Sequence, residues 1–505
     1  MRWIRRLLVG VVLLALGVAA LAAGACRFVL PERFAINAPM AHQMFGLGGV
    51  DASDDLLGQQ IELAEGFGIG LFAEGLRIPR FLRFTSEGDL LVTTTRSGRV
   101  VLLFRDADGD GRSDGRRTLL EGLDRPQGMD FLDGFLYVAE SGAVGRVRFD
   151  PVARTTLGDY ERIVEDIPAG GNHYTRTLRF GPDGWMYVSI GSSCNVCEQD
   201  DPRRAAIVRY RPDGSGEEIF ATGLRNSVGF DWRPGTGELY ATDNGRDLLG
   251  NDFPPCELNL VVQGGFYGWP YANGDRELDP DLGAGHEEEV RASLPPAHPF
   301  RAHNAPLGIT FLRGDGVPAA YRGAALVALH GSWNRTKKDG YSVVSLHWRG
   351  DEIEERAFAT GFERDGDVIG RPVDVAEGPD GAIYVSDDYA GAIYRIAHGE
   401  ASRSAPASAK TRRREHPLGA IPPAERLAAA KRGRFLYTEH DCASCHDAGR
   451  AAPGVLPVPL SDLSARYDVG ELASFLAAPT PPMPAFPLSE QERRDLAVDL
   501  LERHP

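Results

Sequence analysis

The chain is poor in positive charge, and this shortage limits what the protein can bind. Its 505 residues include 55 Lys and Arg against 71 Asp and Glu, which gives a net charge of −16 at pH 7. Such a balance does not favour a phosphate backbone, so we do not expect nucleic acid as a partner. The length exceeds what one hydrophobic core usually serves, which predicts more than one domain.

Cysteine is also scarce, and two of the six cysteines stand in the sequence Cys442-Ala443-Ser444-Cys445-His446. No second cysteine pair follows, which argues against zinc because zinc would need two more ligands nearby. A simple disulfide is an alternative use of the two thiols. Two thiols three residues apart with a histidine directly after them are typical of covalent attachment of haem c. His446 would then bind the haem iron from one side.

Downstream of Cys445 the chain has a single methionine, Met483. Prolines on both sides would hold its thioether on a stiff loop. We therefore expect Met483 to be the second axial ligand of the haem iron, with His504 as its main rival.

The residues around this motif predict a small all-α domain over 421–505. Residues 423–437 form an expected helix with Leu427, Ala430 and Phe435 on one side, and Gly433 would permit close approach of another helix. Ser489 and Glu492 form a capping box that opens a last helix, whose apolar stripe is Leu496, Ala497 and Leu500. The segment resembles class I cytochrome c domains.

The N-terminus has the pattern of a targeting segment over residues 1–26. A basic start at residues 1–6 is followed by 19 uncharged residues from Leu7 to Ala25, which are just long enough to span a bilayer. We expect an export signal or an uncleaved membrane anchor, with lipidation at Cys26 as a weaker alternative. Either route places the body in the periplasm or on the outer face of the cytoplasmic membrane.

Residues 58–398 show short apolar runs separated by Gly, Pro and Asp turns, an all-β pattern. One phrase, a turn followed by an apolar strand, occurs six times, at residues 86–92, 133–138, 181–188, 235–240, 324–329 and 378–385. Repeats of this kind predict a six-bladed β-propeller, with a single large sandwich as the less favoured alternative. Residues 399–420 are small, polar and basic, which predicts a flexible linker to the helical domain.

Three loops between the predicted strands carry residues that could take part in catalysis or binding. His173 follows two glycines at a loop-to-strand junction, where a neutral imidazole could act as a base or could merely hydrogen-bond the loop. Arg225 offers a planar fork suited to carboxylates, although a solvated surface role is the alternative. The turn at Gly245 and Arg246 exposes backbone carbonyls that can bind a hard cation.

Several segments together resemble the quinoprotein sugar dehydrogenases, which comprise the soluble aldose dehydrogenases that use pyrroloquinoline quinone (PQQ) and the sorbosone-dehydrogenase-like branch. The resemblance rests on GGNHYTRTLRFGPDG, GSSCNVC, GLRNSVGFDW, GGFYGWPYANG, APLGITF, GSWNRTKKDGY and GRPVDVAEGPDG. It implies that His173 is the catalytic base and that the carbonyls of Gly245 and Arg246 hold Ca²⁺. The PQQ-binding residues that it implies are Gln127, Arg225, Asn226 and Arg371.

Two positions depart from the pattern of this family. Arg246 stands where the family usually has Gly-Pro, and Val373 stands where a second cofactor arginine is common. The cofactor lysine could be Lys337, Lys338 or neither.

Together these features predict an exported quinohaemoprotein. The propeller would oxidise an aldose or related hydroxy-aldehyde, and electrons would leave through haem c to an external acceptor, a cytochrome or an oxidase. A non-catalytic docking module that carries an electron-transfer cytochrome c is the alternative that the two departures motivate. A lactonase-type hydrolase ranks last because it would leave the haem without an electron source.

The other cysteines and one acidic stretch complete the predictions. Cys194 and Cys197 have no histidine after them, so we expect a small disulfide near His173 and not a second haem site. Cys256 is then left as a buried free thiol. Residues 106–114 resemble the start of a calcium loop but lack its final glutamate, so a solvated turn is an equal alternative.

Overall fold

The computed structural model describes residues 51–399, 421–446, 469–477, 483–484 and 486–504, with a few single positions. Those positions are Ala35, Asn37, Leu418, Leu460, Leu463, Tyr467 and Pro479. The predicted targeting segment at residues 1–26 and most of the linker at 399–420 lie outside the described residues. The chain divides into two compact units, Met1–Pro406 and Ala407–Pro505. None of the helices in the described ranges has the length and apolarity needed to cross a bilayer.

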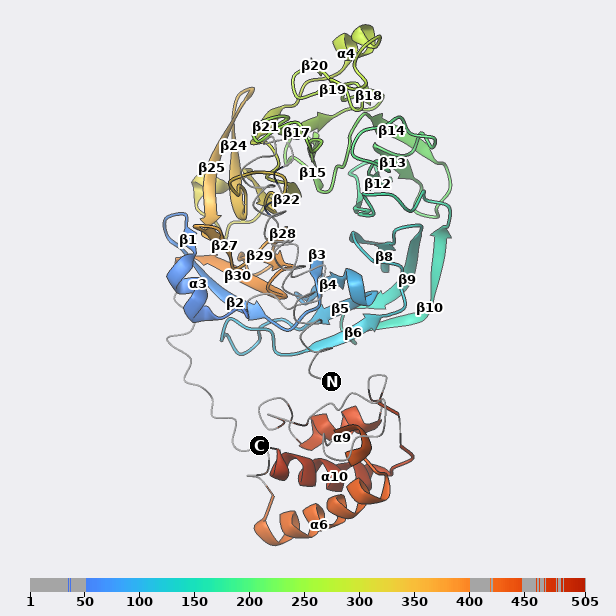
Figure 1. The fold of residues 1–505 in the computed structure, drawn as a ribbon, viewed down its shortest axis with the longest axis vertical. Helices are drawn as coiled ribbons and strands as arrows, with labels where there is room; N and C mark the ends of the chain where they lie inside the picture. Colours follow the sequence, from blue (N-terminus) through green and yellow to red (C-terminus); the bar gives the residue numbers. More distant parts are fainter. Residues whose placement is uncertain are drawn as a thin grey trace, which may run out of the picture. The chain divides into compact units, whose positions relative to one another are not determined.

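The first unit is a ring of six antiparallel blades (Figure 1). Blade one consists of β3 (Pro79–Phe84), β4 (Leu90–Thr94), β5 (Arg99–Leu103) and β6 (Arg116–Leu120). Blade two consists of β7 (Met129–Leu132), β8 (Phe135–Ala139), β9 (Val144–Asp150) and β10 (Thr155–Val164). Blade three consists of β11 (Leu178–Phe180), β12 (Met186–Ile190), β13 (Ala206–Tyr210) and β14 (Glu218–Thr222), with β18 (Gly265–Phe266) added in parallel.

Blade four consists of β15 (Phe230–Trp232), β16 (Leu239–Asp243), β17 (Cys256–Val261) and β21 (His298–Phe300). Blade five consists of β22 (Pro306–Phe311), β23 (Ala325–Leu329), β24 (Ser342–Arg349) and β25 (Glu352–Thr360), with β1 (Glu62–Leu63) on its outer edge. Blade six consists of β28 (Pro372–Glu377), β29 (Ile383–Asp387), β30 (Ala392–His398) and β2 (Phe67–Ala73). The smaller elements are α3 (Asp54–Gln60), α4 (Glu287–Ala292), β19 (Ala272–Asn273), β20 (Glu277–Leu278), β26 (Glu363–Arg364) and β27 (Asp367–Val368).

The six predicted repeats are confirmed as the second strand of each blade. They correspond to β4, β8, β12, β16, β23 and β29, and these strands are buried along almost their whole length. A strand that packs between two neighbouring blades must be apolar on both faces, which explains the continuous apolar runs. The six-bladed prediction is therefore correct.

The ring closes between the two ends of the propeller sequence. Strand β2 pairs with β30 in antiparallel register from Phe67 opposite His398 to Leu71 opposite Tyr394. Strand β2, which precedes blade one in the sequence, thus completes the last blade, and this pairing leaves no open seam in the sheet.

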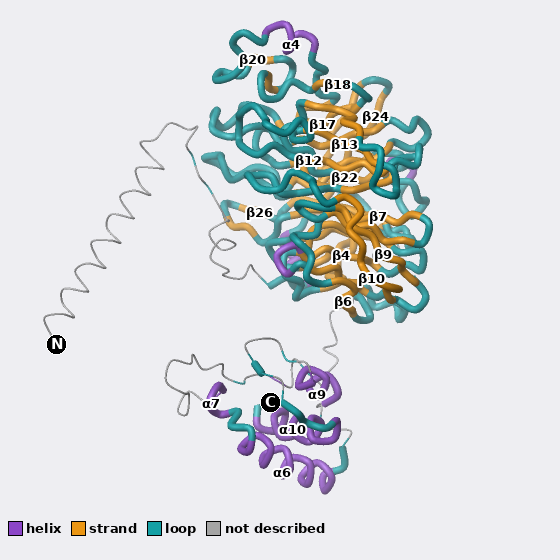
Figure 2. Tube along the Cα trace, turned by 90° about the vertical axis from the view of Figure 1, so that its right-hand side faces the viewer, coloured by secondary structure: helices purple, strands orange, loops and turns teal. Residues whose placement is uncertain are grey.

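The innermost strand of each blade fixes where the loops meet. Each of β3, β7, β11, β15, β22 and β28 starts its blade and hydrogen-bonds on one side only. Because the blades repeat around one axis, the residues just before these strands gather at one end of the central channel. The loops on one face of the propeller are visible in Figure 2.

The described part of the second unit is helical, as predicted. It contains α6 (Pro423–Glu439), α7 (Ala443–His446), α9 (Val469–Ala477) and α10 (Glu490–Arg503). Gly433 lies against α10 so closely that a Cβ atom there would come within 2.2 Å of the Asp495 carbonyl oxygen. The capping box of Ser489 and Glu492 is confirmed at the start of α10. Its apolar stripe, Leu496, Ala497 and Leu500, is buried.

One predicted face of α6 is wrong. Leu427 is 71% exposed and Phe435 is 66% exposed, whereas Ala430 and Leu436 are buried. The small residue Gly433 selects the contact face because it allows the α10 backbone to approach. The side chains of Leu427 and Phe435 therefore point away from this contact.

Candidate functional site

His173 has one ring nitrogen fixed by the protein. Its Nδ1 lies 2.9 Å from both the carbonyl oxygen and the hydroxyl of Ser192. Because a carbonyl only accepts, Nδ1 carries the hydrogen and donates it, so Nε2 of the neutral ring keeps its lone pair. Among the described residues no hydrogen bond to Nε2 is present. Burial, aided by the charge of Arg225, lowers the pKa of His173 to about 3, so the imidazole is neutral at physiological pH.

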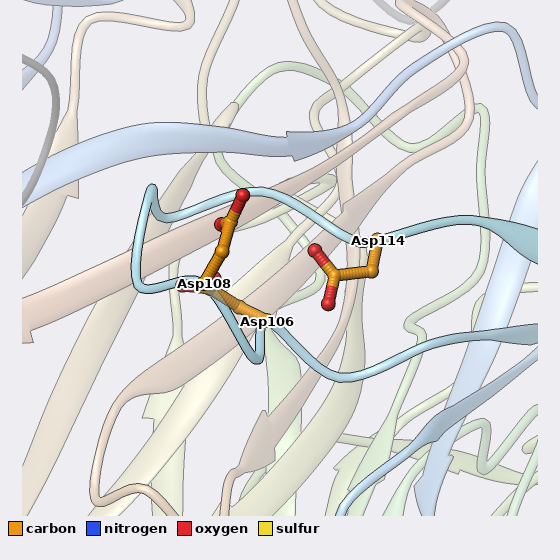
Figure 3. Close-up of side chains that lie close together, drawn as sticks. All are labelled: Asp106, Asp108 and Asp114. Atoms are coloured by element: carbon orange, nitrogen blue, oxygen red, sulfur yellow. The ribbon is translucent and has the colours of Figure 1, made fainter.

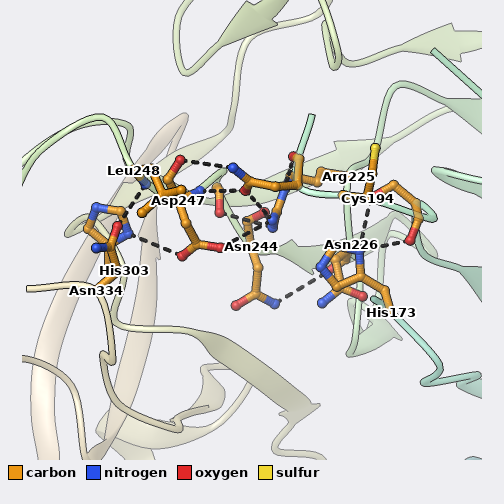
Figure 4. Close-up of polar contacts among 12 residues, drawn as sticks. His173, Cys194, Arg225, Asn226, Asn244, Asp247, Leu248, His303 and Asn334 are labelled. Carbon is orange, nitrogen blue, oxygen red and sulfur yellow. Dashed lines mark hydrogen bonds and ion pairs between the residues drawn. The ribbon is translucent and has the colours of Figure 1, made fainter. Parts of the chain in front are cut away.

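Arg225 is buried, which rules out the solvated surface role considered above. Its Nε donates to the Asn195 carbonyl at 2.9 Å, and its Nη1 donates to the carbonyls of Asn244 and Gly245 at 3.0 Å. Its Nη2 donates to Asn195 Oδ1 at 2.9 Å and lies 3.3 Å from the Asp247 carboxylate (Figure 4). All five N–H donors of the guanidinium therefore have a protein acceptor. Binding a quinone carbonyl would require one of them to change partners, and that role of Arg225 stays a prediction.

Acids at the ends of two repeats hold the predicted cofactor residues. Asp243, the last residue of β16, accepts the backbone N–H of Arg225 at 2.9 Å and that of Asn226. Asp387, the last residue of β29, accepts the backbone N–H of Arg371 at 2.9 Å. The repeat thus places a carboxylate directly under the loop that enters the inner strand of the same blade. Sequence reasoning missed this role, although the acid that ends each of these two apolar runs was the available signal.

Arg371 lies in a second buried cluster. Its guanidinium contacts the His330 ring nitrogen Nδ1 at 3.0 Å, and His330 Nε2 lies 2.9 Å from Asp388, which also pairs with Arg80 at 2.8 Å. Burial and the charge of Arg371 lower the pKa of His330 to about 4. Sequence reasoning did not identify His330 or Asp388.

Two amide side chains at the same end of the channel have atoms without hydrogen-bond partners among the described residues. Both the nitrogen and the oxygen of the Gln127 amide are buried and unpaired, and so is Asn304 Oδ1. A buried polar atom without a partner costs free energy, so such atoms often mark a place where a ligand or water binds. Gln127 and Asn304 precede the inner strands β7 and β22, which places them at the end that also holds His173.

In the turn predicted to hold calcium, one of the two carbonyl oxygens already accepts a hydrogen bond. The Gly245 carbonyl accepts one hydrogen bond from Arg225 and retains a second lone pair. The Arg246 side chain points elsewhere and donates to Asp279 at 2.7 and 2.6 Å and to Asp281 at 2.8 Å. It thereby anchors the insertion that contains β19, β20 and α4 to this turn. The calcium role of the two carbonyls stays a prediction.

Val373, the position of the missing second arginine, is fully buried. It packs in an apolar cluster with Phe81, Val228 and Leu307, each from the start of a different inner strand or the loop before it. These four side chains thus bring together residues from four of the six blades in one buried cluster. An arginine at this position would have to place its charge in that cluster.

The disulfide between Cys194 and Cys197 is confirmed, with the two Cα atoms 6.2 Å apart. Cys256 is a buried free thiol, also as predicted, and burial raises its pKa to about 11. The disulfide lies beside His173, because the Ser192 hydroxyl donates to the Cys194 carbonyl at 2.8 Å (Figure 4).

The acidic stretch at residues 106–114 forms a tight turn in which three carboxylates approach one another (Figure 3). One oxygen each of Asp106, Asp108 and Asp114 lies within 4.8 Å of the others. The Asp106 carboxylate already accepts three backbone N–H groups, including that of Gly111 at 2.8 Å. Both alternatives, a turn and a cation loop, remain compatible with this geometry.

A cavity of about 550 Å³ lies at the opposite end of the inner strands, and sequence reasoning did not predict it. Its charged lining comes from Arg83, Asp130, Arg179, Arg313 and Glu377. Asp130 accepts from Arg83 at 2.9 Å and from the backbone N–H of Phe180 at 2.9 Å. The acids there tie neighbouring blades together, and none of the predicted site residues lines this cavity.

The predicted haem ligands lie in the helical unit. Cys442 is half-buried and Cys445 is exposed, and neither is in a disulfide. The backbone N–H of His446 donates to the Cys442 carbonyl at 3.1 Å, so the two thiols and the imidazole share one turn. Met483 is half-buried against the helical core. His504 Nε2 is buried without a hydrogen-bond partner in the described part of the chain.

Known proteins share the propeller. The sequence profile of the glucose/sorbosone dehydrogenase family matches residues 137–395. A protein of Borreliella burgdorferi with no characterised function is 30% identical over 339 residues, which cover 64% of this chain and 89% of that protein. A PQQ-dependent sugar dehydrogenase of Hypocrea jecorina is 26% identical over 302 residues, which cover 49% of this chain and 69% of that protein.

Among solved structures, the calcium structure of a family AA12 carbohydrate-active enzyme from Trichoderma reesei superposes with a TM-score of 0.59. It is 23% identical, and the match covers 67% of this chain and 97% of that one, which supports the propeller fold. The family profile covers about half of the chain, from β8 in the second blade to β30 in the sixth. By this match, the chain belongs to the glucose/sorbosone dehydrogenase family.

Proposed function

We propose that this protein is a PQQ-dependent oxidoreductase that oxidises an aldose or a related hydroxy-aldehyde. We further propose that a c-type haem on the helical unit delivers the electrons to an external cytochrome or oxidase. The observation that carries the proposal is His173, a neutral imidazole beside the buried cation Arg225 whose Nε2 lone pair no described residue uses. The family membership and the name of the Hypocrea jecorina relative support the same reaction class.

The role of His173 follows from its tautomer. Because Nδ1–H is held by the Ser192 carbonyl, Nε2 can take the proton of the substrate hydroxyl on the carbon that is oxidised. The low pKa of His173 keeps Nε2 available as an acceptor over the whole physiological range. Bound PQQ supplies a two-electron acceptor, and a calcium ion beside it would supply a Lewis acid.

The residues at the channel mouth fit an anionic, hydrogen-bonding cofactor. The unpaired amide of Gln127 and the unpaired Asn304 Oδ1 offer a donor and acceptors that no described residue uses. The buried guanidinium groups of Arg225 and Arg371 supply the positive charge that carboxylates require. Together with Asn226 these residues would hold PQQ, and the Gly245 and Arg246 carbonyls would hold calcium.

The helical unit fits covalent haem. Cys442 and Cys445 are free thiols on the turn that ends at His446. Haem c supplies a one-electron carrier. The two thiols would form its thioether links, and His446 with Met483 would bind the iron.

Two features of the chain favour an exported location, which would suit both cofactors. The Cys194–Cys197 disulfide favours an oxidising compartment such as the periplasm or the outer face of the cytoplasmic membrane. The N-terminal segment at residues 1–26 has the pattern of an export signal or anchor.

The test is anaerobic visible spectroscopy of the haem-loaded protein with calcium and PQQ, before and after addition of a panel of aldoses. We expect the haem bands to be reduced only when both PQQ and a sugar are present. Reduction by dithionite but by no sugar, together with failure to bind PQQ, would contradict the proposal.

The alternative function is a non-catalytic propeller that positions an electron-transfer cytochrome c. It is favoured by Val373, which replaces a charged position with an apolar one, and by Arg246, whose side chain anchors an insertion. The same spectroscopic experiment separates the two functions, because a docking module would neither bind PQQ nor respond to sugar.

A further inference from the structure

We propose that Asn195, held between the two disulfide-bonded cysteines, is the positioning residue that fixes Arg225 and the 244–247 turn at the mouth of the channel. This inference rests on the proposed function, because the groups that it positions are those assigned there to the cofactor and to calcium. It concerns how the site is held together and adds a residue to those that the family resemblance implied.

Asn195 contacts Arg225 at two points. Its carbonyl accepts from Arg225 Nε, and its side-chain Oδ1 accepts from Arg225 Nη2, both at 2.9 Å. Because two nitrogens of the guanidinium donate to the same residue, the group cannot turn without breaking both hydrogen bonds. The remaining nitrogen, Nη1, then points at the carbonyls of Asn244 and Gly245.

Asn195 also binds the turn that Arg225 contacts. Its Oδ1 accepts the backbone N–H of Asp247 at 2.8 Å, and its Nδ2 donates to the Asp247 carbonyl at 3.1 Å. The amide of one side chain therefore completes a pair of hydrogen bonds to the Asp247 backbone. Arg225, Asp247 and the Gly245 carbonyl are fixed relative to one another through this single residue.

The disulfide explains why this turn can hold its partners. Asn195 is one of only two residues between Cys194 and Cys197, so the covalent link restricts its backbone. The same segment holds the catalytic base, since Ser192 contacts His173 Nδ1 and its backbone N–H donates to the Arg225 carbonyl at 2.8 Å. Gln199 closes the turn from the other side, because its Oε1 accepts the Ser193 N–H at 2.8 Å and its Nε2 lies 3.1 Å from Cys197 Sγ.

The test compares Asn195→Ala with Asn195→Asp in the full-length, haem-loaded protein. Asn195→Ala removes the side-chain contacts to Arg225 and Asp247, and we expect kcat/KM for the sugar to fall about tenfold or more, the effect of losing a hydrogen bond to a charged group. Asn195→Asp keeps an acceptor for Arg225 and for the Asp247 N–H but loses the donor to the Asp247 carbonyl, so we expect it to restore part of this loss. Asn251→Ala is the matched control, because Asn251 is a loop asparagine whose side chain, among the described residues, hydrogen-bonds only Thr336. We expect it to retain the original kcat/KM.

A second readout does not depend on turnover. Hydrogen–deuterium exchange should show the Asp247 amide losing at least about tenfold of its protection in Asn195→Ala and in Cys194→Ser/Cys197→Ser, but not in Asn251→Ala. Unchanged exchange at Asp247, or equal kinetic losses in Asn195→Ala and Asn195→Asp, would overturn the inference. If the unaltered protein oxidises no sugar, the proposed function fails while the exchange result still decides the role of Asn195. If Asn195→Ala does not fold, the cysteine double variant supplies the same exchange comparison.

Discussion

Asp243 and Glu257 face each other as directly paired residues of the antiparallel strands β16 and β17, beneath the loop that carries Arg225. Both carboxyl groups are buried. Burial raises the pKa of Asp243 to about 7 and that of Glu257 to about 8, and the charge of Asp243 adds to the shift at Glu257. The strands that support the site therefore contain two acids that titrate near neutral pH.

The stability of the propeller should consequently fall as pH rises. An unfolded glutamate ionises with a pKa of about 4.3, whereas folded Glu257 holds its proton up to about pH 8. Between these values the native state binds more protons than the unfolded state, so the free energy of unfolding decreases with rising pH. In Glu257→Gln this contribution is absent. We expect the decrease in Tm between pH 5 and pH 9 to be smaller in the variant by a few °C, within about 2–8 °C.

The measurement is thermal unfolding followed by circular dichroism at several pH values. Asp243, Asp374 and Asp387, whose pKa values are also raised by burial, contribute a slope of the same sign in both proteins. Only the difference between the two curves reports on Glu257. Parallel curves would show that Glu257 is ionised in the folded protein at neutral pH.

Replacement of His173 by Gln should strongly reduce sugar oxidation. Glutamine can hydrogen-bond the Ser192 carbonyl, but it has no nitrogen lone pair that can take a proton at neutral pH. Loss of a general base typically lowers the rate by about 10²–10⁴-fold. We expect kcat to fall within this range while the haem content, measured from the absorbance of the reduced haem, stays the same. Wild-type activity in this variant would refute the assignment of the base.

Substitution of Gly433 by Ala should unfold the helical unit and leave the propeller intact. A Cβ atom at this position would come within 2.2 Å of the Asp495 carbonyl, so α6 and α10 would have to separate. Overpacking of this kind usually costs about 1–3 kcal/mol, which is large for so small a unit. We expect the variant to lose haem incorporation while it keeps the far-ultraviolet signal of the β-sheets.

Gly58→Ala is the matched control for this substitution. Gly58 lies inside helix α3, and a Cβ atom there would meet no other atom within 4 Å. Alanine in a helix interior is favoured over glycine by about 0.5–1 kcal/mol. The control should therefore show an unchanged or higher Tm and normal haem content. Equal haem loss in both variants would indicate that the effect of Gly433→Ala is not local.

The features that could be predicted from sequence are those set by local pattern. Turn-plus-strand repeats indicated the second strand of each blade, and the Ser489 and Glu492 spacing indicated the start of α10, because each depends on residues close together in the chain. The prediction that Gly433 permits helix contact succeeded for a similar reason. The lack of a side chain at Gly433 is known from the sequence alone, whichever segment packs against this residue.

The features that sequence could not provide depend on contacts between distant segments. The hydrogen bonds of Arg225 come from segments around residues 195 and 245, so its burial and its five acceptors required the folded loops. The exposed Leu427 and Phe435 show the same limit on α6. Helical periodicity indicated an apolar side of α6, but α10 packs against the side that contains Gly433.

The second axial ligand of the proposed haem iron is open to direct test, because the structure presents two candidates. Met483 is half-buried against the helical core, where its thioether is held by packing. His504 has a buried Nε2 with no hydrogen-bond partner in the described ranges, and burial lowers its pKa.

We expect Met483 to be the ligand, because prolines flank it on both sides in the sequence and because thioether ligation is common in the c-type cytochromes that this segment resembles. Met483→Ala should open a coordination position, so added imidazole should bind the haem and shift its absorption bands. His504→Ala is the control and should leave both the spectrum and the resistance to imidazole unchanged. If imidazole instead binds only to His504→Ala, the histidine is the ligand and the Met483 loop has a packing role, since the iron accepts the added base only where its own ligand is missing.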